Sequence, residues 1–227
     1  MKQHLAAIRA LFDYLVTGGV LPFNPAAAVR GPRIVTRKGK TRPLTPDQAR
    51  ALLASIDVET IVGLRDRALI GFMLNGFARI SAVLNTTVEN DFGDVLRLHE
   101  KGGKLHDVPL NTKARAYLDA YLDVAGIREE KKTPLFRAVD RSRRLTKRPL
   151  HRNDAWAMVK RRAKKAGLPD SVTNHTFRAT GITAYRENGG SLERAQAIAA
   201  HANPRTTSLY DHSEEKITAA ELERVGI

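Results

Sequence analysis

Apolar residues recur with a helical period at the start of the chain. Between Leu5 and Leu15 they fall on one face of a predicted amphipathic helix, which the Gly18-Gly19 pair ends. Residues 30–42 lose this period and contain glycine, proline and cationic side chains but no acidic residue. They predict an extended basic linker, which is either a solvated tether or a segment that follows a phosphate backbone.

The pattern after the linker predicts a second, larger region. Thr45, Pro46 and Gln48 combine an N-cap, a proline in the first turn and a capping box, so a helix and a domain are expected to begin there. Another helix is predicted over about residues 59–74. The segments "TTVEND", "DVLRLHE" and "KLHDVPL" then alternate as strands do and predict a three-stranded antiparallel sheet. Because "KGG" separates the last two, Lys101 is expected at the tip of a β-hairpin.

Helices dominate the remainder of the chain. Asn111 predicts the N-cap of an amphipathic helix, and a strongly basic helix is predicted over "RNDAWAMVKRRAKKAG". Further helices are expected over residues 175–187 and 191–200, and a short one after the Asn203-Pro204 pair. The amphipathic tail "KITAAELERVGI" packs either on its own core or on a neighbouring protomer. The pattern therefore predicts a mainly α protein of the α+β class, with one small sheet.

The composition points to a polyanionic partner. The chain of 227 residues has 38 Lys and Arg against 24 Asp and Glu, a net charge of +14. Such an excess favours nucleic acid, although a basic protein with hydrated lysines gives the same count. The chain has no cysteine, which excludes disulfides, thiolate zinc sites and cysteine nucleophiles and fits a reducing cytoplasm. No segment approaches the roughly 20 apolar residues of a membrane span.

Three features have a chemistry that the helical pattern does not explain. Arg79 lies in the apolar segment "GFARISAVL" and needs an anion there, either a carboxylate such as that of Glu89 or a phosphate. His175 and Arg178 share a helix face, which favours an anion between them or else ordinary surface chemistry. Tyr210, in "AHANPRTTSLYDH", is a core aromatic, a stacking platform or a nucleophile.

Taken together, these motifs resemble those of the tyrosine recombinases, the phage integrase family. The matching segments are "FARISAVL", "HEKGGKLHDVPL", "HTFR" and "AHANPRTTSLYDH", and their order agrees with the family. Two separations also agree, with 201 − 175 = 26 and 210 − 201 = 9. The resemblance implies that six residues of this chain form the catalytic set: Arg79, Lys101, His175, Arg178, His201 and Tyr210. One position departs from the family pattern, because Ala82 stands where the family commonly has an acidic residue.

The resemblance implies a fold and a domain division. Residues 43–227 are expected to form a helical catalytic domain of the DNA breaking-rejoining type, with a C-terminal tail helix. Residues 30–42 correspond to the interdomain linker, and residues 1–29 to the last part of an N-terminal core-binding domain.

The resemblance also implies a reaction that needs neither a metal ion nor ATP. Tyr210 attacks a DNA phosphodiester and forms a 3′-phosphotyrosine intermediate, which a 5′ hydroxyl later resolves. Arg79 and Arg178 hold the phosphoryl oxygens, His175 takes the tyrosine proton and His201 donates a hydrogen bond to the phosphate. Lys101 protonates the leaving 5′ oxygen. These roles suit a phenol whose reference pKa of about 10 makes it a weak nucleophile without help.

The expected partner is double-stranded DNA, on which the monomer assembles into a tetramer at the nucleoid in the cytoplasm. The basic side chains expected to contact DNA are Arg37, Lys38, Lys40, Arg42, Lys160, Arg161 and Lys164. Two alternatives remain open from the residues alone. One is a nicking and closing enzyme similar to type IB topoisomerases, and the other is a non-catalytic DNA-binding protein on the same fold.

Overall fold

The computed structural model describes residues 2–32, 39, 41–100 and 102–212. The chain divides into two compact units, Met1–Arg37 and Lys38–Ile227. No helix in the described part is both long and apolar enough to cross a membrane. The predicted tail helix and most of the predicted linker lie outside the described residues.

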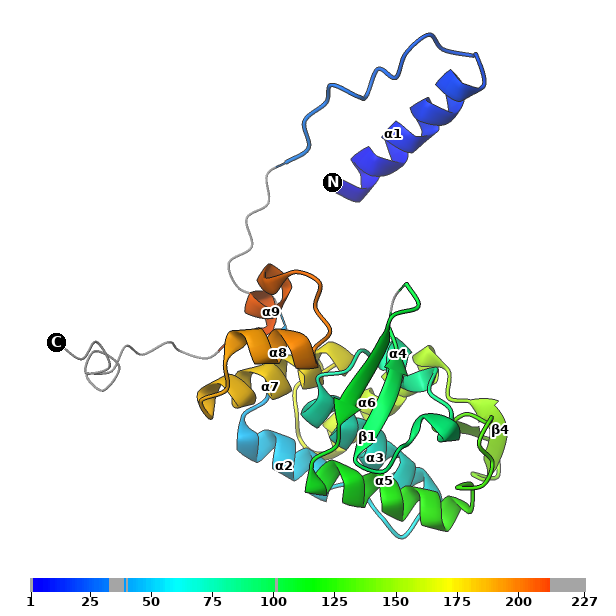
Figure 1. Ribbon diagram of the computed structural model, residues 1–227, viewed down its shortest axis with the longest axis vertical. Coiled ribbons are helices and arrows are strands. Elements are labelled where there is room, and N and C mark those ends of the chain that lie inside the picture. Colours follow the sequence, from blue (N-terminus) through cyan, green and yellow to red (C-terminus); the bar gives the residue numbers. More distant parts are fainter. Residues whose placement is uncertain (1, 33–38, 40, 101, 213–227) are drawn as a thin grey trace, which may run out of the picture. The chain divides into compact units, whose positions relative to one another are not determined.

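The smaller unit contains a single helix in its described part, α1 (Lys2–Thr17), drawn in dark blue in Figure 1. It ends directly before Gly18 and Gly19, as the sequence predicts. Arg9 fixes the turn that follows, because its guanidinium donates hydrogen bonds to the carbonyls of Ala26 and Val29.

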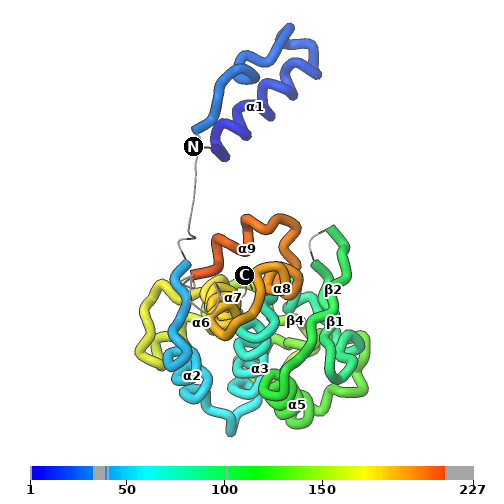
Figure 2. The backbone as a smooth tube through the Cα atoms, turned by 60° about the vertical axis from the view of Figure 1, so that its left-hand side comes forward, coloured from blue at the N-terminus to red at the C-terminus, as the bar shows by residue number. Residues whose placement is uncertain are grey.

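The larger unit begins with the predicted capped helix. In α2 (Pro46–Ala54), the Thr45 side chain accepts from the Gln48 amide and the Gln48 side chain accepts from the Thr45 amide, so the capping box is confirmed. The next predicted helix is α3 (Ile61–Gly76), which begins after Thr60 and is buried along most of its length. It forms the centre of this unit (Figure 2).

The β structure is smaller and more divided than the predicted three-stranded sheet. The predicted hairpin is present as β1 (Val95–His99) paired antiparallel with β2 (Leu105–Pro109). A second antiparallel pair, β3 (Arg137–Val139) with β4 (Leu145–Pro149), has no counterpart among the predicted strands. Within the described residues the sheets are therefore two separate pairs rather than one sheet of three strands.

The predicted strand "TTVEND" is a short 3-10 helix, η1 (Val88–Asn90). The Asn90 side chain accepts hydrogen bonds from both the amide and the hydroxyl of Thr87, which closes the turn locally. Polar side chains that bond to nearby backbone compete with strand pairing in this way. Only isolated bridges at Thr87 and Asp91 remain of the expected pairing in this segment.

The remaining helices agree with the predicted segments, except that the short helix α4 was not predicted. Asn111 caps α5, Gly126 ends it in the left-handed conformation with φ 63°, and Asn203 caps the last described helix. Their bounds are α4 (Ile80–Leu84), α5 (Thr112–Ala125), α6 (Arg152–Lys165), α7 (Asn174–Glu187), α8 (Leu192–Ile198) and α9 (Pro204–Tyr210). Figure 1 shows α7, α8 and α9 grouped together, with the β1–β2 hairpin projecting from the same unit.

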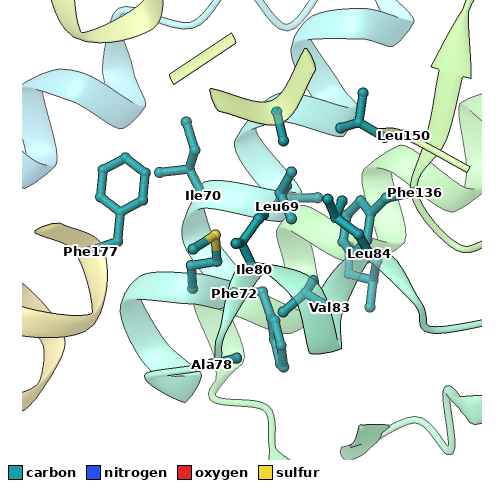
Figure 3. Packing of buried hydrophobic residues seen from close by; sticks show 14 of the residues in the cluster. Leu69, Ile70, Phe72, Ala78, Ile80, Val83, Leu84, Phe136, Leu150 and Phe177 are labelled. Atoms are coloured by element: carbon teal, nitrogen blue, oxygen red, sulfur yellow. The ribbon is translucent and has the colours of Figure 1, made fainter. Parts of the chain in front are cut away.

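The main apolar core surrounds α3. Leu69 and Ile70 are fully buried at its centre. They lie between Phe177 of α7 on one side and Phe136, which directly precedes β3, on the other (Figure 3). Burial of apolar side chains of this size contributes about 1.5–3 kcal/mol each. The core therefore fixes α7 rigidly against α3, and α7 contains two of the candidate catalytic residues.

Candidate active site

Arg178 is the most deeply buried of the candidate residues, with 2% of its surface exposed. Its guanidinium donates hydrogen bonds to the carbonyls of Phe77 and Ala199 and, over 3.2 Å from Nε, to Nε2 of His201. All of these acceptors are neutral. Burial, and then the charge of Arg79, lower the pKa of Arg178 to about 10.

The close approach of α7 to the end of α3 brings Arg178 to the Phe77 carbonyl. Gly181 permits this approach, because a Cβ there would lie 2.1 Å from the carbonyl oxygen of Leu74. Phe77 ends α3 in the left-handed conformation, with φ 48°. The backbone turn at Phe77 thus places Arg79 two residues later, at the N-cap of α4.

His201 is buried, with 6% of its surface exposed, and follows Ala200 in the left-handed conformation. Its Nδ1 lies 2.9 Å from Oγ1 of Thr207, and its Nε2 accepts from Arg178. The Nε2 acceptor role assigns the ring proton to Nδ1. Burial, with the charges of Arg178 and Arg79, lowers the pKa of His201 to about 3, so the ring is neutral near pH 7.

Tyr210 is the last residue of α9, and its ring lies close to two histidines. The ring centroid is 5.6 Å from that of His201 and 6.4 Å from that of His175. The Arg178 guanidinium carbon lies 5.6 Å from the same tyrosine centroid. Thr183 on α7 anchors the end of α9. Its hydroxyl donates to the Tyr210 carbonyl and accepts from the His212 amide.

The phenol oxygen of Tyr210 lies 3.4 Å from Nδ1 of His175. This distance is long for a hydrogen bond. Partial burial of the His175 ring, followed by the charges of Arg178, Arg152 and Arg79, lowers its pKa below the ordinary value. His175 is therefore neutral near pH 7 and can accept the tyrosine proton.

Arg79 is partly exposed, with 35% of its side chain accessible, and contacts Oε2 of Glu100 over 2.7 Å. The same nitrogen lies 3.5 Å from the carbonyl oxygen of Ala200, on the segment that leads to His201. The sequence offered Glu89 as a structural partner for Arg79, but the structure pairs Arg79 with Glu100 instead. Glu100, like Thr207, belongs to the site and was not predicted from the sequence.

The structure thus brings together five of the six residues in the predicted catalytic set. They come from α4, α7, the segment before α9 and α9 itself, and they are Arg79, His175, Arg178, His201 and Tyr210. Lys101, which the sequence places between β1 and β2, lies outside the described residues. Among the residues that the structure describes, no group of three histidine or acidic side chains is arranged to hold a metal ion.

The predicted DNA-contacting residues have different surroundings. Arg42, Arg161 and Lys164 are exposed, whereas the Lys160 ammonium bonds to the Asp170 carbonyl and lies 5.4 Å from the centre of the Trp156 ring. Arg37, Lys38 and Lys40 lie outside the described residues.

An open groove lies beside the candidate catalytic residues. It has a volume of about 810 Å³ and is lined by residues of α4, α6 and α7, among them His175, Arg152 and Trp156. Trp156 is half exposed in it. The groove connects the predicted basic helix α6 with the catalytic cluster.

A model of the phage integrase family matches residues 42–216. The chain belongs to the phage integrase family. It is a tyrosine recombinase, an enzyme that transfers DNA strands through a tyrosine in site-specific recombination. The predicted family, enzyme class and mainly helical fold are thereby confirmed, with two small antiparallel pairs in place of the predicted three-stranded sheet.

Curated members of the family match most of this chain. It is 30% identical over 222 residues to the tyrosine recombinase XerC of Chlamydia muridarum, covering 96% of this chain and 68% of that protein. It is 34% identical to the tyrosine recombinase XerD of Xanthomonas campestris pv. campestris over 215 residues, which is 91% of this chain and 65% of that protein.

Solved structures of integrases have the same fold at lower identity. The Tn1549 transposon integrase, in complex with transposon right end DNA, has a TM-score of 0.71 and 20% identity and covers 100% of this chain and 79% of that one. A lambda integrase dimer bound to a COC′ core site has a TM-score of 0.70 and 17% identity, covering 95% and 61%.

Proposed function

We propose that Tyr210 is the nucleophile of this recombinase and that it forms a covalent 3′-phosphotyrosine link with DNA. The observation that carries the proposal is the position of the Tyr210 ring near both His175 and His201 and near the buried guanidinium of Arg178. A phenol has a reference pKa of about 10 and needs a base, while the attacked phosphate needs fixed positive charge.

His175 is the proposed base. Its Nδ1 faces the Tyr210 oxygen over 3.4 Å, and its lowered pKa keeps the ring neutral at neutral pH. In the tautomer with the ring proton on Nε2, Nδ1 is the acceptor for the tyrosine proton. Arg79 and Arg178 are the proposed clamp for the non-bridging phosphoryl oxygens, because planar guanidinium groups can bind phosphate at two points. Lys101 remains the proposed general acid for the leaving 5′ oxygen.

His201 has a different proposed role from the one expected. The sequence predicts that it donates a hydrogen bond to the phosphate, but its Nε2 accepts from Arg178 and its Nδ1 bonds to Thr207. We therefore propose that His201 orients the Arg178 side chain in this arrangement. A direct bond to phosphate would require His201 to release Arg178 and to carry its proton on Nε2.

Double-stranded DNA is the proposed substrate, and several neighbours of the same fold are DNA complexes. The exposed cations of α6, the groove beside it and residues 30–42 are the proposed contacts with the DNA backbone. We further propose that residues 43–227 are the catalytic domain and residues 1–29 the end of a core-binding domain. The enzyme would act at the nucleoid in the cytoplasm, as a monomer that DNA gathers into a tetramer.

A nicked duplex that traps the covalent intermediate tests this proposal. The duplex is selected by the protein itself from a random pool, so that no target site has to be assumed. Tyr210→Phe is expected to bind this DNA as the parent does and to form no adduct. Tyr185→Phe, which alters another tyrosine of the same unit, is the matched control and should form the adduct normally.

Adduct of undiminished yield in the Tyr210→Phe variant would overturn the assignment. Exchange of strands between two labelled duplexes separates recombination from simple nicking and closing. If the parent forms the adduct but only relaxes supercoiled DNA, the reaction is of the topoisomerase type.

A further inference from the structure

Glu100 is a buried carboxylate that the proposed reaction does not use. Its side chain is 5% exposed, and it directly precedes Lys101 at the end of β1. Its backbone closes the hairpin turn, because its amide donates to the Lys104 carbonyl and its carbonyl accepts from the Gly103 amide. The carboxylate is therefore held on a hydrogen-bonded part of the hairpin.

The only ion pair of Glu100 within the described residues is with Arg79. The distance from Nη1 of Arg79 to Oε2 of Glu100 is 2.7 Å, and Arg79 is the more exposed partner. A buried carboxylate is unfavourable unless a cation and hydrogen bonds compensate for its lost hydration. The pair therefore restricts the rotamers of both side chains. The restriction is greater for Arg79, because an arginine side chain has many rotamers to lose.

The helix that follows Arg79 offers no alternative carboxylate. Ala82, three residues after Arg79, is buried with 2% of its surface exposed and cannot form an ion pair. Among the residues that the structure describes, the one other contact that fixes the Arg79 side chain is a long one of 3.5 Å to the Ala200 carbonyl. The orientation of Arg79 therefore depends on a residue of the β1–β2 hairpin rather than on its own helix.

We propose that Glu100 is a positioning residue that orients Arg79 for the scissile phosphate. This inference rests on the proposed function, in which Arg79 binds a non-bridging phosphoryl oxygen. Glu100 engages one terminal nitrogen of the guanidinium, which leaves the other N–H groups for the phosphate. It acts mainly through Arg79 and does not contact the DNA. It also links the phosphate clamp to the hairpin that carries the proposed general acid.

The effect of Glu100 on Arg178 supports the same assignment. The negative charge of Glu100 favours the protonated form of Arg178 and so opposes the lowering of its pKa by burial and by Arg79. One carboxylate thus moderates the repulsion between two guanidinium groups that must both face one phosphate. A phosphate carries out the same neutralisation once it is bound.

Glu100→Gln is the first test, because it keeps the size of the side chain and removes its charge. We expect cleavage of the nicked duplex to slow by about 10- to 100-fold, the usual loss when a residue that orients a ligand-binding group is replaced. DNA binding and the melting temperature are expected to stay near the parent values. Asp107→Asn is the matched control, since Asp107 forms an exposed pair with Arg97 on the same hairpin. It should cleave normally.

A double-mutant cycle with Arg79 distinguishes positioning from a general structural role. If Glu100 acts mainly through Arg79, Glu100→Gln causes little further loss of cleavage in an Arg79→Ala background. Equal losses in the two backgrounds would overturn the inference, as would cleavage at or above the parent rate in Glu100→Gln. Glu100→Asp keeps the charge and provides a second variant if the glutamine variant melts early, and it should cleave faster than Glu100→Gln.

The same data separate this inference from the proposed function. If Arg79→Ala itself cleaves at the parent rate, the phosphate clamp is wrong and the inference falls with it. If Arg79→Ala is defective but Glu100→Gln is not, the clamp stands and only the positioning role is wrong.

Discussion

Two clusters in this protein each combine two arginines with one buried carboxylate, and they are arranged differently. In the first, Asp66 accepts from Arg65 on Oδ1 and from Arg162 on Oδ2, each through two nitrogens at 2.7–3.1 Å. In the second, within the described part of the chain, the Glu100 carboxylate pairs with Arg79 alone, through one nitrogen, and the hydrogen-bond acceptors of Arg178 are all neutral.

The formal charges of the two clusters are equal, so charge alone does not distinguish a structural cluster from a site. The difference is how many guanidinium N–H groups a carboxylate satisfies. The Asp66 cluster joins α3 to α6 and commits both arginines to that purpose. The second cluster leaves Arg178 buried without a carboxylate bond, and its pKa is lowered to about 10. Such an arrangement favours an incoming anion, which in the proposed function is the phosphate of DNA.

The largest expected effect is the loss of stability in Asp66→Asn. This change leaves two arginines, one of them fully buried, without their carboxylate, and removal of one partner from a buried pair costs about 3–5 kcal/mol. Urea unfolding should show this loss in the free energy of unfolding. The cleavage rate per folded molecule should stay near that of the parent. A cleavage defect that exceeds the loss of folded protein would contradict the division between the two clusters.

Arg178→Ala is expected to do the opposite, lowering the cleavage rate more than the free energy of unfolding. Removal of a preorganised donor to a developing charge costs about 10²–10³ in rate, or about 2.7–4 kcal/mol of barrier. Arg178→Lys should recover only part of this, since lysine lacks the planar two-point geometry. Single-turnover cleavage measures the loss, and Arg97→Ala, at an exposed pair, is the control. Parent-like cleavage in Arg178→Lys would show that the fork geometry is not needed.

His201 should make stability depend on pH. Its folded pKa of about 3 lies below the ordinary 6.5, so between these values the unfolded chain binds a proton that the folded chain does not. The stabilising contribution is complete above pH 6.5 and is lost as the pH falls toward 3, by up to about 1.4 kcal/mol per unit.

Urea unfolding from pH 7 to pH 4 tests this expectation against His201→Asn. The asparagine variant cannot bind that proton, so its stability should decline less steeply than that of the parent. Equal slopes for the two proteins would mean that His201 titrates normally in the fold.

The smallest expected effect is a change in the salt dependence of DNA binding, which should differ between two neighbouring arginines of α6. Arg161 is exposed, whereas Arg162 bonds to Asp66. Arg161→Ala should weaken DNA binding slightly and reduce the slope of log K against log salt by about 0.9, the value for one phosphate contact. Arg162→Ala should instead lower stability and leave that slope unchanged. A reduced slope in Arg162→Ala alone would reverse the assignment of these two residues.

The sequence predicts the helices well where local signals set their ends. The capping box at Thr45, the cap at Asn111 and the Asn203-Pro204 pair all act within a few residues, and each helix begins where they predict. The "TTVEND" segment was predicted wrongly because a side-chain cap at Thr87 replaces the strand pairing that its alternation suggests. The β3–β4 pair was not predicted, because its strands are short, are paired with a register shift and show no clear alternation of apolar and polar residues.

The candidate site was predicted through its motifs, but its supporting contacts were not. Glu100 lies 21 positions from Arg79, and only the folded hairpin brings the two together. The bond between His201 and Arg178 depends on the left-handed turn at Ala200, which a sequence pattern does not reveal. Chemistry that depends on residue type is visible in the sequence, whereas orientation depends on tertiary contacts.

The central claim is that Tyr210 attacks a phosphate held beside Arg178. The most direct measurement is mass spectrometry of the trapped adduct after digestion with nuclease and trypsin. Trypsin releases the segment "TTSLYDHSEEK", in which Tyr210 is the only tyrosine. The account predicts a nucleotide joined through its 3′ phosphate to Tyr210 in this peptide. A nucleotide on any other residue, or a 5′ linkage, would contradict it.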